Sequence, residues 1–156
     1  MRRRILSTVL AAGLIVSPVL ALAQEAVKPA GIALSGDGIA ASQLTPESLA
    51  ALPSVTMEVS FQTSKGEEKA TYSGVLLWTV LEKAGLLKGE GHHAELKHGI
   101  TVVGRDGYAI HFSVGEIAPD FGNKAIIVAL ARDGKPLDAG ALRVIVPGDK
   151  RGARSV

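Results

Sequence analysis

Apolar and polar residues alternate most clearly in the stretch SVTMEVSFQT, residues 54–63. Val55, Met57, Val59 and Phe61 occupy every second position, and polar side chains fill the positions between them. Because successive side chains of a strand point to opposite faces, this pattern predicts a β-strand with one apolar face and one polar face.

Two segments show helical features instead. In TPESLAALP, Thr45 is suited to cap a short helix, Pro46 to occupy its first turn and Pro53 to end it. In VLLWTVLEKAG, residues 75–85, the apolar residues recur at helical spacing, and the glycine at the end predicts a C-terminal cap. Ser73 is the N-cap that this pattern predicts.

The remaining chain predicts mainly strands. A brief strand is expected at residues 32–36, followed by a turn. Two hairpins are expected with Asp-Gly turns at residues 106–107 and 133–134, and a last strand is expected at LRVIVPG, residues 142–148. Between the hairpins, SVGE predicts a helical turn with a capping box of Ser113 and Glu116. The predicted class is therefore α+β, with mostly antiparallel or mixed strands and two or three short helices.

The N-terminal residues predict export. Three arginines precede an apolar run, and Ala21-Leu22-Ala23 forms a small-residue cleavage site, so we expect residues 1–23 to be a signal peptide. An uncleaved membrane anchor is the alternative, but the apolar run is short for a spanning helix. After cleavage we expect a linker at residues 24–30 and a single domain at residues 31–156, periplasmic or secreted and without membrane contact.

Charge and cysteine content exclude several classes. The formal net charge is +2, and removal of the three arginines of the leader would leave −1, so nothing predicts a nucleic-acid partner. The chain has no cysteine, which excludes a disulfide framework, a thiolate metal site and a cysteine nucleophile. The four histidines match no metal-ligand spacing, and His92 and His93 are interpreted as loop residues.

The chain contains, in order, the segments VTMEV, YSGVLLWTVLEKAGL, DGYAIHFSVGE, AIIVALARDGKPLDAGALRVIVPG and RGARSV. This ordered set resembles the molybdopterin-binding domain of the sulfite-oxidase family, from about residue 32 to residue 156. The resemblance implies a mixed α/β domain that cradles an anionic pterin, with molybdopterin as the cofactor. It also implies that Val59 stands where relatives carry the cysteine that ligates molybdenum.

The last residues are the strongest candidates for a ligand site. Lys150, Arg151, Arg154 and Ser155 lie in a segment that approaches the cofactor in relatives, but a solvated tail is the alternative interpretation. The chain ends at Val156, before the lysine and tryptophan that follow in relatives, and the sequence leaves open whether this end is truncated or a natural remnant.

Two further arginines are candidates for anion binding. Arg105 lies in the predicted turn GRDGY, where a solvated position is the alternative, and Arg143 lies in the last predicted strand among apolar neighbours. An arginine there must reach either solvent or a partner, because burial of an unpaired charge is costly.

Two functions follow as hypotheses. The first is a non-catalytic binding module with a cleft for a pterin-like or other anionic ligand, or for a periplasmic protein partner. The second is an oxidoreductase that holds the molybdenum cofactor through the pterin alone, without a cysteine ligand. We favour the first, because the thiolate belongs to the coordination shell of the metal and tunes its electronics.

Overall fold

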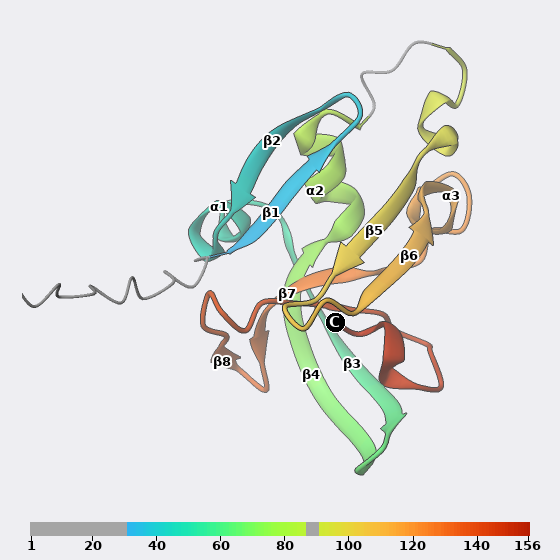
Figure 1. The fold of residues 1–156 in the computed structure, drawn as a ribbon. Coiled ribbons are helices and arrows are strands. Elements are labelled where there is room, and N and C mark those ends of the chain that lie inside the picture. Colours follow the sequence, from blue (N-terminus) through green and yellow to red (C-terminus); the bar gives the residue numbers. More distant parts are fainter. Residues whose placement is uncertain (1–30, 87–90) are drawn as a thin grey trace, which may run out of the picture.

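Three sheets and three short α-helices form the part of the chain that this computed structural model describes, residues 31–86 and 91–156 (Figure 1). The predicted α+β class with mostly antiparallel strands is confirmed. The predicted signal peptide at residues 1–23, the predicted linker at residues 24–30 and residues 87–90 all lie outside the described residues.

The largest sheet has five strands, and β7 lies in its middle. Its strands are β3 (Ser54–Thr63), β4 (Gly66–Leu76), β7 (Ile127–Arg132), β8 (Lys135–Pro136) and β9 (Arg143–Ile145). One edge of β7 pairs with β4, and the other edge pairs with β9 along its first half and with β8 along its second half, always antiparallel. The strand predicted at residues 54–63 is confirmed over its full length.

Two separate hairpins flank this sheet (Figure 1). The first consists of β1 (Ile32–Gly36) and β2 (Ile39–Leu44), and the second of β5 (Gly99–Val103) and β6 (Ala109–Ser113). The turn predicted at residues 106–107 is confirmed. β2 was not predicted, because most of its residues are exposed and show no alternation of apolar and polar side chains.

The helices are α1 (Pro46–Ala50), α2 (Leu77–Ala84) and α3 (Val114–Ile117), with 3-10 turns η2 (Ala94–Lys97) and η3 (Gly152–Arg154). α1 and α2 both contact β4 of the main sheet, and α3 contacts β6 and η2. α2 follows β4 directly and its apolar stripe is buried, so this helix joins the main sheet to the rest of the core.

Most of the predicted caps are present. The Thr45 side chain accepts a hydrogen bond from the Ser48 backbone N–H, and Gly85 ends α2 with a left-handed φ of 108°. The Ser113 side chain accepts from the Gly115 N–H, but Glu116 does not complete the predicted capping box; its carboxylate binds side chains of other segments instead.

The prediction of Ser73 as the N-cap of the second helix is wrong. Strand β4 continues through Ser73 to Leu76, which is the N-cap residue and makes no side-chain capping bond. The Ser73 hydroxyl instead lies 2.8 Å from the hydroxyl of Thr56 on β3. Pairing of β4 with strands on both sides outweighs the local capping preference of a serine.

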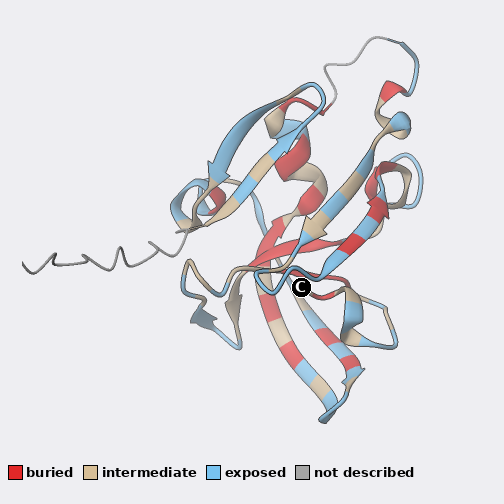
Figure 2. Ribbon diagram, viewed as in Figure 1, coloured by how far each residue is buried: buried red, intermediate tan, exposed pale blue. Residues whose placement is uncertain are grey.

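The apolar core consists of two clusters on opposite faces of the main sheet. In β7, Val128 belongs to the first cluster, whereas Ile127 and Ala129 belong to the second, so this strand is buried on both faces (Figure 2). The second cluster, called cluster two below, comprises seven buried residues: Val59, Phe61, Ala70, Tyr72, Ile127, Ala129 and Ile145.

Candidate functional site

The C-terminal segment, residues 147–156, is docked against two strands. The Gln62 backbone N–H on β3 donates to the Lys150 carbonyl at 3.0 Å, and Gln62 and Arg151 form a parallel bridge. At the end of the segment, the Val146 N–H donates to the Ser155 hydroxyl at 3.2 Å. The segment is therefore part of the fold, which argues against the interpretation of a solvated tail.

Arg154 forms an ion-pair network with two carboxylates. Its Nε and Nη2 donate to the two oxygens of Asp149 at 2.7 and 2.8 Å, and its Nη1 donates to Glu116 Oε1 at 3.1 Å. Lys124 Nζ lies 2.8 Å from Asp149 and 3.5 Å from Glu116. Hydrogen bonding to Asp149 raises the pKa of Arg154, and hydrogen bonding to Arg154 lowers the pKa of Asp149.

The network predicts a loss of stability in acid. The pKa of Asp149 is lowered from its ordinary value of 3.8, so its contribution to folding stability is complete above that value and is lost as the pH falls through the lower folded-state pKa. We expect Asp149→Asn to cost about 1–2 kcal/mol at neutral pH, since Arg154 is partly exposed. Urea unfolding between pH 7 and pH 2 measures both effects.

The control variant is Asp120→Asn, which removes an exposed carboxylate that forms no ion pair with the described residues. It should leave the unfolding midpoint within about 0.5 kcal/mol of the unmodified protein. If Asp149→Asn behaved in the same way at pH 7, the ion-pair network would not contribute to stability.

Arg143 and Ser155 interact directly. Arg143 Nη2 donates to the Ser155 carbonyl at 2.9 Å, and the buried Ser155 hydroxyl accepts from the backbone N–H of Val146, the residue after β9. Arg143 therefore reaches a partner within the protein, which is one of the two outcomes expected of a half-buried arginine. Both predicted residues help to hold the C-terminal segment.

Arg105 lies on a turn that touches the same segment. Its Nη2 donates to the Ala139 carbonyl at 3.3 Å, and the side chain is exposed. A methyl group at the neighbouring Gly104 would lie 2.9 Å from Val156 Cγ1, so the β5–β6 turn contacts the last residue of the chain. The structure thus brings the Arg105 turn next to the docked C-terminal segment, although Arg105 itself contacts another loop.

One polar group on β4 and β7 was not predicted. The Tyr72 hydroxyl donates to Glu68 Oε1 at 2.9 Å, and Arg132 Nη1 lies 3.2 Å from the same oxygen. Burial is the main cause of the raised pKa of Tyr72, and the hydrogen bond to Glu68 raises this pKa further. A spacing of four residues on β4 places Tyr72 and Glu68 on one face, and this spacing is the only signal in the sequence.

Val59 lies inside cluster two and is 3% exposed. Its neighbour Phe61 is covered by the C-terminal segment, because a methyl group at Gly152 would lie 2.5 Å from the Phe61 ring. The position that the family resemblance assigns to the metal ligand is therefore occupied by an aliphatic side chain in an apolar cluster. The sulfur atoms of the chain belong to two methionines, and it has no cysteine. Its residues therefore cannot supply the thiolate ligand of a molybdenum site.

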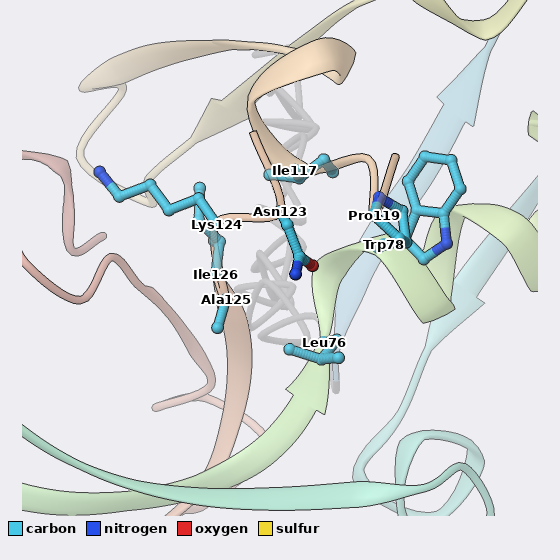
Figure 3. Close-up of a pocket in the computed structure, with 8 residues that line it drawn as sticks. All are labelled: Leu76, Trp78, Ile117, Pro119, Asn123, Lys124, Ala125 and Ile126. Atoms are coloured by element: carbon cyan, nitrogen blue, oxygen red, sulfur yellow. The ribbon is translucent and has the colours of Figure 1, made fainter. Parts of the chain in front are cut away.

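A small cavity of about 60 Å³ lies at the start of α2 (Figure 3). Trp78, Pro119 and Asn123 line it, and Asn123 has a left-handed φ of 46°. This volume is far below the range of roughly 300–1,000 Å³ that is typical of small-molecule sites. None of the six predicted site residues lines this cavity.

The described contacts of the histidine side chains are with other aromatic rings, such as that of Phe121 at 5.1 Å from the His93 ring, and with single polar groups. The rings of His92 and His93 lie 3.8 Å apart, and His93 Nδ1 lies 3.3 Å from Glu95. His111 Nδ1 lies 3.0 Å from the Thr101 hydroxyl on the exposed face of the β5–β6 hairpin. Within residues 31–86 and 91–156, no group of three or more His, Asp or Glu side chains is arranged to hold a metal ion.

No protein-family model matches the chain, and no curated protein sequence matches it. The resemblance to the sulfite-oxidase family therefore depends on the sequence motifs alone. No helix among the described residues is long and apolar enough to cross a membrane.

Proposed function

We propose that the chain is an exported, non-catalytic binding module of the sulfite-oxidase molybdopterin-binding type. Its ligand would be a small anion, such as the phosphate of a pterin or of another metabolite, held at Lys150 and Arg151. A periplasmic protein with an acidic surface is the other class of partner that such a site would accept. The proposal places the protein in the periplasm or outside the cell.

The charge balance of the docked C-terminal segment supports this proposal most directly. Asp149 and Glu116 neutralise Arg154 and Lys124, whereas Lys150 and Arg151 are exposed and have no such carboxylate among the contacts of the described residues. Backbone pairing with Gln62 fixes the backbone of Lys150 and Arg151. Their two cationic side chains therefore extend from an ordered segment. Charge-assisted hydrogen bonds to phosphate contribute roughly 1.5–3 kcal/mol each when they are partly shielded from water, and less when exposed.

The burial of Val59 favours binding over redox chemistry. An oxidoreductase that holds its cofactor through the pterin alone would need oxygen or nitrogen donors to replace the thiolate. Val59 and its neighbours in cluster two supply only apolar side chains and the Tyr72 ring, whose hydroxyl is bonded to Glu68. The oxidoreductase remains the alternative proposal.

The test uses inorganic pyrophosphate as the probe, titrated by calorimetry into the protein in the processed form that an expression host yields. We expect a Kd in roughly the millimolar range, which weakens about tenfold in the double variant Lys150→Ala, Arg151→Ala. The matched control is Lys97→Ala, Lys135→Ala, which removes two exposed lysines on η2 and β8. Equal loss in both double variants would contradict a site at the C-terminal segment.

Metal analysis of the same protein separates the two proposals. Protein from a molybdenum-replete host should contain no stoichiometric molybdenum by mass spectrometry. It should also show no pterin fluorescence after acid extraction. Stoichiometric molybdenum would overturn the non-catalytic proposal and favour the oxidoreductase.

A further inference from the structure

A larger cavity lies between three elements that the proposed function does not use. It is a groove with one wall from the β1–β2 hairpin, one from α1 and one from α2, and its volume is about 480 Å³. This volume lies within the range typical of small-molecule sites. Figure 1 shows the hairpin beside α2, with α1 at one end. The groove is lined by ten residues: Leu34, Ser42, Leu44, Ser48, Leu49, Ala51, Leu52, Val80, Lys83 and Ala84.

The lining is aliphatic except at three positions. Ser48 is committed to the cap of α1, since its hydroxyl donates to the Thr45 carbonyl at 3.0 Å. Ser42 is exposed on β2. Lys83 is the only charged residue of the lining, and no carboxylate within the described ranges forms an ion pair with it. The groove therefore offers an apolar surface with one positive charge.

The position of Lys83 gives the groove a polarity. It lies in the last turn of α2 and is exposed, while Val80, one turn earlier on the same helix face, is buried and also lines the groove. A lysine stem covers apolar surface while its ammonium group stays in water. An anionic group would thus be held at the solvent side of the groove, with the apolar part of the same molecule against the leucines of the hairpin and α1.

We propose that this groove binds a free amphiphile with one carboxylate and a medium-length alkyl chain. The alkyl chain contacts Leu34, Leu44 and Leu52, and the carboxylate pairs with Lys83. Burial of each methylene group contributes about 0.8 kcal/mol, so the alkyl chain provides most of the affinity and Lys83 selects the head group. The site shares no residue with the docked C-terminal segment, so the proposal is independent of anion binding there.

The test uses octanoate as the probe, titrated into ¹⁵N-labelled protein in the processed form that an expression host yields. We expect the amide shifts to concentrate on the β1–β2 hairpin, α1 and α2. Lys83→Met should weaken octanoate binding roughly three- to fivefold and leave the binding of uncharged 1-octanol unchanged. Lys97→Met is the matched control, because Lys97 is exposed on η2 and does not line the groove.

A second pair of variants tests the apolar part of the groove. Ala51→Trp places an indole in the space that the alkyl chain needs and should abolish the shifts. Ala50→Trp alters a neighbouring exposed residue that does not line the groove, and should bind octanoate normally. Thermal unfolding of both variants shows that they are folded.

Three results of the titrations would overturn the proposal: no shifts at millimolar octanoate, shifts that lie outside these three elements, or an equal effect of Ala51→Trp and Ala50→Trp. Flotation with phosphatidylglycerol vesicles separates a free amphiphile from a lipid surface. We expect the protein to stay with the soluble fraction; co-flotation that Lys83→Met abolishes would assign the groove to a membrane surface and contradict a free ligand.

Discussion

Gly74→Ala is expected to destabilise the protein by roughly 3 kcal/mol, enough to unfold a large fraction of a marginally stable domain. A methyl group at position 74 would lie 2.1 Å from the Val128 carbonyl oxygen and 2.8 Å from the Ala129 Cα, both backbone atoms of β7. The contact falls where the register of β4 and β7 shifts, between Ser73 and Gly74. Because β4 is paired with β3 on its other edge, it cannot move away without loss of that pairing.

The measurement is urea unfolding followed by circular dichroism, with Gly99→Ala as the control. At Gly99 on β5, the nearest atom to an added methyl group would be the Phe112 carbonyl oxygen at 3.9 Å, which is an ordinary van der Waals distance. This variant should lie within about 0.5 kcal/mol of the unmodified protein. Equal unfolding midpoints for the two variants would show that β4 and β7 leave room for a methyl group at position 74, and would contradict the close approach of their backbones.

Local patterns predicted the elements that local forces determine. The alternation of residues 54–63 and the apolar run before Asp133 correspond to β3 and β7, because a buried face repeats at the period of its element. Ser73 failed as a cap because its surroundings are decided by β3 and β7, which are distant in the sequence. β2 was missed because its exposed residues carry no periodic signal.

The candidate site shows a similar limit. The basic character of the C-terminal segment is visible in the sequence, but the partner that neutralises Arg154 from α3, Glu116, is 38 residues away. Only the fold brings that carboxylate to Arg154, whereas Lys150 and Arg151 of the same segment form no ion pair with a carboxylate of the described residues. The groove beside Lys83 was equally unpredictable, since it is formed by three elements and one of them contains the unpredicted strand β2.

A thiol introduced by Val59→Cys is expected to be protected from solvent. Val59 is 3% exposed in cluster two, and a buried cysteine behaves as a small apolar residue with a raised thiol pKa. The chain has no native cysteine, so a thiol reagent reports on this position alone. We expect labelling in native buffer to be at least about a hundredfold slower than in urea, because it requires the cluster to open.

Glu58→Cys is the control, since the Glu58 side chain is 64% exposed on the opposite face of the same strand. Its thiol should react at the rate of the unfolded chain, while both variants keep near-native stability. The same Val59→Cys protein, purified from a molybdenum-replete host, should carry no molybdenum, because a thiol inside cluster two cannot reach a cofactor. Rapid labelling at position 59 together with stoichiometric molybdenum would mean that this position faces a cofactor cleft. The substitution of one valine would then separate this chain from the redox chemistry of the family that it resembles.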